Sequence, residues 1–212
     1  MSIKKKSVLL IIFLILIDQV SKFYIKLNFP LSYSDFYGDH NAVEVFSWFK
    51  IFFVENEGAA FGMKIVGKLF LTLFRIAAVI FLGIFIHKLI KRNARTGYIL
   101  AISVLLAGAA GNIIDSVFYG VIFSESTYTQ AAVLFPEGGG YVPLFYGKVV
   151  DMLYFPLITN SAGETVFFRW IFNIADSCVT VSVVVIFLFF RKELNESLEG
   201  RKKHKETEVE EE

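Results

Sequence analysis

Four apolar stretches alternate with polar segments along the chain and predict four membrane-spanning helices. Each has about the 20 residues that a helix needs to cross the hydrocarbon core of a bilayer. The predicted spans are residues 8–25, 69–90, 98–118 and 170–190. Two long polar and aromatic segments, residues 26–68 and 119–169, lie on the same side of the membrane if all four spans cross it.

The two long segments differ in their local patterns. Alternating and aromatic residues at 43–54 predict two or more short strands that lead to a glycine turn at Gly58. The second segment contains Pro136, Pro143 and the glycines at 138–140, which favour a loop or a loose hairpin over another span. The expected fold is a mainly α membrane protein with four transmembrane helices and a small extracytoplasmic β-sheet on the membrane surface.

Basic residues gather at one end of the predicted helices. They are Lys4, Lys5 and Lys6, then Lys88, Lys91, Arg92 and Arg95, then Arg191 and Lys192. Cytoplasmic loops are enriched in such residues, so both termini are expected in the cytoplasm. The first lysines imitate a secretory signal peptide, but no small-residue cleavage site follows, so an uncleaved span is expected. Residues 1–192 are expected to form a single integral membrane domain, and residues 193–212 a charged cytoplasmic tail.

Composition supports a membrane protein and narrows the possible chemistry. Hydrophobic residues make up 55% of the chain, above the usual 45–50%. The net charge is +1 and the basic residues are segregated, so no nucleic-acid surface is indicated. The single cysteine, Cys178, excludes an internal disulfide. The three histidines lie far apart, so we expect neither a histidine triad nor a bound metal or other cofactor.

Aspartates near the outer ends of the spans are the candidate chemistry. Asn173 and Asp176 interrupt the start of the fourth span, and Asn112 and Asp115 repeat that spacing at the end of the third. Asp151 lies just before the chain returns to the bilayer. An ionisable side chain in a membrane costs at least about 2.5–3.5 kcal/mol and commonly marks a functional site.

Two carboxyl groups that share a site do not ionise equally, because the first charge raises the pKa of the second. Such a pair can hydrolyse an amide. The ionised member takes a proton from the attacking water and the protonated member donates to the developing oxyanion. Spacing alone pairs Asp115 with Asp176. The structural alternative is that these aspartates cap helices or pair with Arg75 and Arg169.

Asp18 and Lys22 lie four residues apart on the first predicted helix. They therefore share a face and can neutralise one another. A direct contact of this pair with a substrate is the alternative interpretation.

Five motifs occur in an order that resembles lipoprotein signal peptidase, also called signal peptidase II, an aspartic peptidase family of the bacterial cytoplasmic membrane. They are DQVSK at 18–22, NEGAAFG at 56–62, GNIID at 111–115, VVD at 149–151 and FNIAD at 172–176. The resemblance covers nearly the whole chain. It implies an intramembrane endopeptidase that cleaves the signal peptide before a diacylglyceryl-modified cysteine of a prolipoprotein.

The resemblance also implies roles for individual residues. Asp151 and Asp176 are the implied catalytic dyad, so Asp115 moves to a supporting role. The implied substrate-binding or supporting residues are Asp18, Lys22, Asn56, Gly58, Asn112, Asp115 and Asn173. Prolipoproteins and membrane lipid are the implied partners, and the active site is expected near the outer leaflet of the inner membrane. We expect a monomer.

The chain departs from the family pattern at two places. Ser116 stands where the family usually has an arginine, and Arg169 or Arg75 are candidates to supply that charge. The run 120–147 is longer than the usual link between the motifs, and we hypothesise an extra hairpin or flap over the substrate groove.

Two other functions use the same residues. A proton-coupled carrier would need ionisable groups through the depth of the membrane, whereas Asp18, Asp115, Asp151 and Asp176 gather at the outer end. A structural membrane subunit would tolerate replacement of these aspartates by asparagine.

Overall fold

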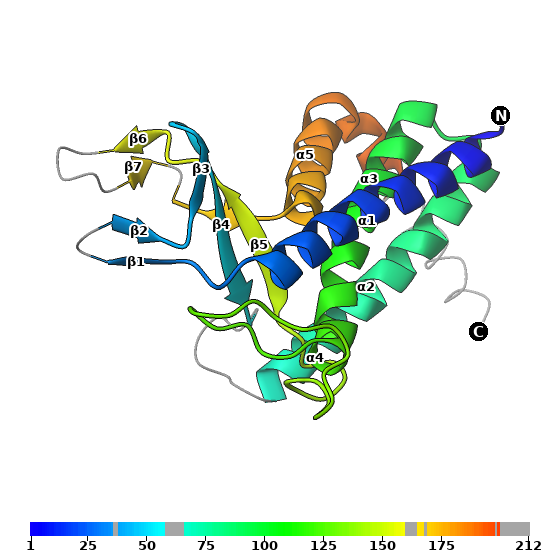
Figure 1. Ribbon diagram of the computed structural model, residues 1–212. Coiled ribbons are helices and arrows are strands. Elements are labelled where there is room, and N and C mark those ends of the chain that lie inside the picture. Colours follow the sequence, from blue (N-terminus) through cyan, green and yellow to red (C-terminus); the bar gives the residue numbers. More distant parts are fainter. Residues whose placement is uncertain (36–37, 58–65, 160–164, 168, 198, 200–212) are drawn as a thin grey trace.

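The computed structural model describes residues 1–35, 38–57, 66–159, 165–167, 169–197 and 199. Figure 1 shows two parts, a group of long helices and a set of strands beside one end of that group. The helices are α1 (Ile3–Asn28), α2 (Val66–Lys91), α3 (Thr96–Ile114), the short α4 (Gly120–Ile122) and α5 (Ile174–Phe189). The mainly α membrane fold predicted from the sequence is confirmed.

The helices match the predicted spans with one difference at the fourth. Three stretches, Ile3–Asn28, Gly67–Lys91 and Thr96–Ile122, are long and apolar enough to cross a membrane. The fourth qualifies only when α5 is joined to Arg191–Ser197, which follows after a bend of 91°. The predicted start at residue 170 is too early, because Ile171 and Phe172 form a strand and the helix begins at Ile174.

A four-stranded antiparallel sheet has the order β3-β4-β5-β8. Its strands are β3 (Val43–Phe46), β4 (Phe49–Asn56), β5 (Val149–Tyr154) and β8 (Ile171–Phe172). Two small hairpins pair β1 (Tyr33–Asp35) with β2 (Gly38–His40) and β6 (Ile158–Thr159) with β7 (Thr165–Phe167). The strands predicted at 43–54 are confirmed, and Gly58 lies outside the described residues.

Segments distant in the sequence meet in this sheet. Val54 of β4 faces Asp151 of β5, and Leu153 of β5 faces Phe172 of β8. The chain then passes from β8 directly into α5. The sheet therefore places β5 beside the N-terminal end of α5.

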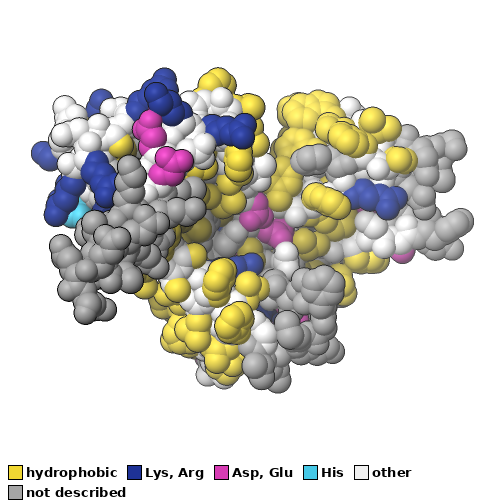
Figure 2. All heavy atoms as spheres, turned by 180° about the vertical axis from the view of Figure 1, so that it is seen from behind, with side chains coloured by type: hydrophobic (Ala, Val, Ile, Leu, Met, Phe, Trp, Pro, Cys, Tyr) yellow, Lys and Arg dark blue, Asp and Glu magenta, His cyan; other side chains and the backbone are white. Residues whose placement is uncertain are grey.

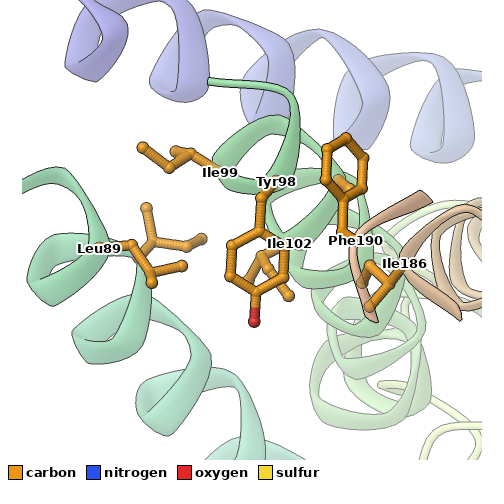
Figure 3. Close-up of a cluster of buried hydrophobic side chains, with 8 residues drawn as sticks. Leu89, Tyr98, Ile99, Ile102, Ile186 and Phe190 are labelled. Atoms are coloured by element: carbon orange, nitrogen blue, oxygen red, sulfur yellow. The ribbon is translucent and has the colours of Figure 1, made fainter. Parts of the chain in front are cut away.

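The opposite end of the bundle has its own hydrophobic core. Figure 3 shows Leu89, Tyr98, Ile99, Ile102, Ile186 and Phe190 packed together from α2, α3 and the end of α5. Ile3 of α1 packs against the same cluster. The first residues of α1 and α3 and the last residues of α2 and α5 therefore lie at one end, away from the sheet.

The long segment after α3 folds back against the end of that helix. A π-helical turn, Asp115–Tyr119, continues α3 into α4. Tyr119, Phe123 and Ala132 are buried with Val150 and Met152 of β5 in a second core. Between Phe123 and Lys148 the only strand-like pairing is a single bridge from Phe123 to Leu134. This segment is therefore a packed loop with one antiparallel bridge, in agreement with the loop or loose hairpin expected from the sequence, and a flap over the substrate groove stays a hypothesis.

Two glycines of α3 let neighbouring helices approach closely. A Cβ atom at Gly108 would lie 2.4 Å from the carbonyl oxygen of Ala175 in α5. A Cβ atom at Gly111 would lie 2.6 Å from Oδ2 of Asp18 in α1. Small residues at helix contacts are typical of membrane proteins, where the lipid supplies little hydrophobic drive for helix association. Gly108 and Gly111 therefore let α3 pack closely against α5 and α1.

We expect Gly111→Ala to lower the stability of the protein in detergent by about 1–3 kcal/mol, because the added methyl group displaces the Asp18 carboxylate. Thermal unfolding would measure the change. Gly138→Ala is the matched control, since a Cβ atom there meets nothing within 4 Å. Equal unfolding temperatures for the two variants would contradict the proposed close packing.

Candidate active site

Asp151 and Asp176 lie where the sheet meets α5. Asp151 is a buried residue within β5, and Asp176 lies in the first turn of α5. Asn173 caps that helix: its side chain accepts a hydrogen bond from the backbone of Asp176 at 2.8 Å. The Asp176 side chain accepts in return from the backbone of Asn173 at 3.3 Å. This capping box fixes the Asp176 carboxylate at the helix N-terminus.

Two asparagine side chains connect the two carboxylates. Asn173 Nδ2 donates to Asp151 Oδ1 at 2.7 Å, and Asn112 Nδ2 donates to Asp176 Oδ1 at 2.7 Å. Asn173 Nδ2 also donates to Asn112 Oδ1 at 3.0 Å, so the two amides contact one another. The sequence predicts these four residues as site residues, and the fold brings them together. The repeated Asn-x-x-Asp spacing corresponds to this pair of amides.

A buried ion cluster lies directly behind the asparagines. Lys22 Nζ is 2.9 Å from Asp18 Oδ2 and 2.8 Å from Asp115 Oδ2, and it donates to Asn112 Oδ1 at 2.9 Å. The expected Asp18–Lys22 ion pair is therefore present, with Asp115 as a second partner. An ammonium group is only a donor, so it fixes Asn112 with its oxygen toward Lys22 and its NH₂ group toward Asp176.

The cluster also holds the backbone on which the dyad is built. The backbone nitrogen of Ala175 donates to Asp18 Oδ1 at 2.9 Å, at the start of α5. The backbone nitrogen of Val150 donates to Asp115 Oδ2 at 3.2 Å, next to Asp151 in β5. Asp115 therefore supports the site from behind.

Gln19 is a supporting residue that the sequence did not single out. Its Nε2 donates to Asp18 Oδ2 at 3.1 Å and to Asp115 Oδ1 at 3.0 Å, and its Oε1 accepts from the Tyr119 hydroxyl at 3.1 Å. Its polar side chain inside an apolar span could have marked Gln19 as a site residue. However, neighbouring positions on a helix point in different directions, so nothing in the sequence indicated that Gln19 lies beside Asp18.

A second buried polar cluster near the sheet was also missed. Lys26 contacts Glu55 and Ser126, and Ser126 Oγ donates to Glu55 Oε1 at 2.8 Å. The three residues come from α1, β4 and the long loop. No local pattern joins positions so far apart. The cluster holds the end of β4, where Asn56 Nδ2 donates to Asp151 Oδ2 at 3.3 Å.

The remaining sequence expectations have separate outcomes. Gly58 lies outside the described residues. The hydroxyl groups of Ser116 and Ser177 donate to the carbonyl oxygens of Asn112 and Asn173. Arg169 donates to the Thr165 carbonyl. Among the described residues, no group of three or more histidines, cysteines and acids could hold a metal ion.

Burial raises the pKa of Asp151 to about 7, and the nearby charge of Asp176 acts in the same direction. Hydrogen bonds from Asn56 and Asn173 oppose this shift. The carboxyl group of Asp151 is therefore protonated in part at neutral pH. A carboxyl pair that carries a proton near neutrality supplies an acid and a base at one place.

Figure 2 shows acidic side chains in a hollow between two apolar surfaces, with a basic side chain close by. Fold and site together define a class: a helical membrane protein with an acid–base pair of carboxyl groups at the end of its bundle. This class includes membrane aspartic peptidases and also carriers, so comparison with known proteins is needed.

A family model described as signal peptidase (SPase) II matches residues 10–191. The chain belongs to this family of peptidases. The lipoprotein signal peptidase of Porphyromonas gingivalis is 42% identical over 203 residues, which cover 91% of this chain and 86% of that protein. The lipoprotein signal peptidase of Amoebophilus asiaticus is 31% identical, over 92% of this chain and 80% of that protein.

Two solved structures of a bacterial membrane enzyme have a similar fold. The first, at 1.9 Å resolution, has a TM-score of 0.58 and 26% identity over 87% of this chain and 91% of that chain. The second, at 2.3 Å resolution, has a TM-score of 0.56 and 27% identity over 91% of each chain. Family membership favours the peptidase over the carrier and the structural subunit.

We expect Lys22→Gln to destabilise the protein by about 3–5 kcal/mol, because it leaves two buried carboxylates without their cation. Thermal unfolding in detergent would measure the change. Lys50→Gln is the control, since Lys50 pairs with Asp39 at a partly exposed site where an ion pair contributes about 0–1 kcal/mol. A Lys22→Gln variant as stable as this control would refute the role given to the cluster.

Proposed function

We propose that this protein is an aspartic endopeptidase that removes signal peptides from diacylglyceryl-modified prolipoproteins, with Asp151 and Asp176 as its catalytic dyad. The observation that carries the proposal is the bridge of Asn112 and Asn173 between the two carboxylates. Family membership supports the reaction and its substrate class. The hydrogen bonds of the described residues support the choice of dyad.

Asp176 is the proposed base. Its oxygens accept hydrogen bonds from the Asn112 side chain and the Asn173 backbone, which suits an ionised carboxylate. It also lies in the first turn of α5, where the helix dipole favours negative charge. In this mechanism Asp176 takes a proton from water as the water oxygen attacks the scissile carbonyl carbon.

Asp151 is the proposed acid. Its raised pKa leaves it the proton that the developing oxyanion needs. When the tetrahedral intermediate collapses, the C–N bond breaks, the proton held by Asp176 passes to the leaving amine, and a hydroxyl proton of the intermediate returns to Asp151. The products are the signal peptide with a free carboxylate and the lipoprotein with a free amino group. The two carboxyl groups belong to one site, so these roles describe the resting state of the pair.

The active site is proposed to lie near the outer leaflet of the cytoplasmic membrane, with both termini in the cytoplasm. The bundle end opposite the sheet carries the start of α1 and the α2–α3 turn, which are rich in lysine and arginine. Such an end is favoured on the cytoplasmic side. The sheet and the dyad then face outward, where membrane lipid and prolipoproteins are the proposed partners of a monomeric enzyme. Residues 1–192 form the proposed catalytic domain.

We expect Asp151→Asn and Asp176→Asn each to reduce cleavage of a diacylglyceryl-modified prolipoprotein by at least about 1000-fold, because an amide supplies neither the acid nor the base. The assay would follow release of the signal peptide by purified protein. Asp39→Asn, far from the dyad, is the control and should cleave at the parent rate. No cleavage by the parent protein, or full cleavage by either dyad variant, would reject the proposal.

We expect kcat/KM to fall as the pH rises through about 7, because Asp151 then loses the proton that it donates. A raised carboxyl pKa also means that the folded state binds more protons than the unfolded state between about pH 4 and 7. The contribution of Asp151 to the free energy of unfolding therefore decreases as the pH rises from about 4 to 7, and it does not change further above pH 7. Rates measured from pH 5 to 9, with unfolding temperatures at each pH, would separate the effects. A rate that rises from pH 7 to 9 would contradict the assignment of Asp151.

A further inference from the structure

Arg75 is a charged residue in the middle of an otherwise strongly apolar helix, α2. Its neighbours Leu73 and Phe74 are largely exposed on the outer surface of the bundle, whereas Thr72 is buried and Arg75 is half-buried. Residues three apart on a helix share a face. Thr72 and Arg75 therefore lie together on the inward face of α2.

The inward face of α2 is turned toward the dyad. Thr72 Oγ1 donates to the carbonyl oxygen of Phe145 at 3.2 Å, in the loop that leads into β5. The positive charge of Arg75 is attracted by Asp176 and, more weakly, by Asp151. The backbone nitrogen of Phe145 in turn donates to the carbonyl oxygen of Val117 at 3.1 Å, so this face of α2 lies near the C-terminal end of α3, where Asn112 donates to Asp176.

Arg75 nevertheless has no direct partner in the described part of the chain. It makes no ion pair with Asp176 or Asp151, and no hydrogen bond of its guanidinium group to another described residue is present. A guanidinium group has five N–H donors and no acceptor. Donors that are partly withdrawn from water need acceptors, and an arginine inside a span is costly unless it serves a site.

The hollow that contains acidic side chains in Figure 2 suits a substrate that supplies oxygen acceptors. The other arginine near the sheet, Arg169, differs because its Nε donates to the carbonyl oxygen of Thr165. A lipidated precursor offers two kinds of carbonyl oxygen, in its peptide groups and in the esters of its diacylglyceryl group. Both are neutral acceptors that an arginine can bind without neutralising the dyad.

We propose that Arg75 is a substrate-binding residue whose guanidinium group donates hydrogen bonds to a carbonyl oxygen of the lipoprotein precursor and holds it over Asp151 and Asp176. This inference rests on the proposed function. The interaction forms when the precursor binds and persists during hydrolysis, so it acts on KM more than on kcat.

The test compares Arg75→Gln and Arg75→Lys with the parent protein over a range of concentrations of a diacylglyceryl-modified prolipoprotein. Arg75→Gln should raise KM by about 10- to 100-fold, the loss expected for hydrogen bonds from a charged donor, and leave kcat within about threefold. Arg75→Lys should recover part of the loss because it retains the charge. Arg92→Gln, the same change beyond the far end of α2, is the control and should leave KM unchanged.

A second precursor, with a dialkylglyceryl group joined by ethers, identifies the carbonyl oxygen. An equal effect of Arg75→Gln on both precursors supports a peptide carbonyl, and an effect confined to the ester precursor supports a lipid carbonyl. An unchanged KM overturns the inference, and so does a loss of kcat together with a lower unfolding temperature. If the parent protein cleaves neither precursor, the proposed function itself fails and the inference falls with it.

Discussion

The geometry of the site depends on one lysine ammonium group, Lys22, shared by two buried carboxylates. A buried ion pair gains little net stability over an apolar core, because both charges lose their hydration. Here the ion pairs of Lys22 instead fix the positions of the chain segments around the site. The second oxygen of Asp18 holds the backbone at the start of α5, and the same oxygen of Asp115 that pairs with Lys22 also holds the backbone of β5 beside Asp151. One cation therefore fixes helices α1 and α3, the first turn of α5 and the strand of Asp151 relative to one another.

A layer of neutral amides separates this ion cluster from the dyad. Asn112 accepts from Lys22 and donates to Asp176, and Asn173 donates to both Asn112 and Asp151. If Lys22 contacted Asp151 directly, its charge would favour ionisation and remove the proton that hydrolysis needs. The amides fix the positions of the two carboxylates and keep the ammonium group of Lys22 out of contact with Asp151. Lys22 has a smaller effect on the pKa of Asp151 than burial, Asp176, Asn56 or Asn173. The arrangement thus gives precise placement and a raised pKa at the same time.

The sequence predicts those parts of the molecule whose signal is local. The lengths of the apolar stretches locate the spans, and the four-residue spacing of Asp18 and Lys22 predicts their ion pair. The predicted start at residue 170 lies four residues before α5, because Trp170, Ile171 and Phe172 are as apolar as the helix, whereas Ile171 and Phe172 pair with β5 as strand β8. Spacing alone paired Asp115 with Asp176, since nothing local shows that β5 brings Asp151 closer. The cluster of Lys26, Glu55 and Ser126 joins three distant segments, and each of its residues alone has an ordinary surface interpretation.

Hydrolysis of a lipidated peptide needs water, lipid and an accessible peptide bond at one place, and the position of the dyad meets these needs. A carboxyl pair at mid-membrane would lack water, and one on the sheet alone would be away from the acyl chains. Asp176 belongs to the first turn of α5 and Asp151 to a strand beside it, so in the proposed orientation the pair lies where lipid-facing and water-facing structure meet. Figure 2 shows acidic side chains in a hollow between apolar surfaces. Asp18 and Asp115 hold the backbone around both residues, so the site has its shape before the substrate binds. None of the substrate's binding energy is then needed to arrange the catalytic groups.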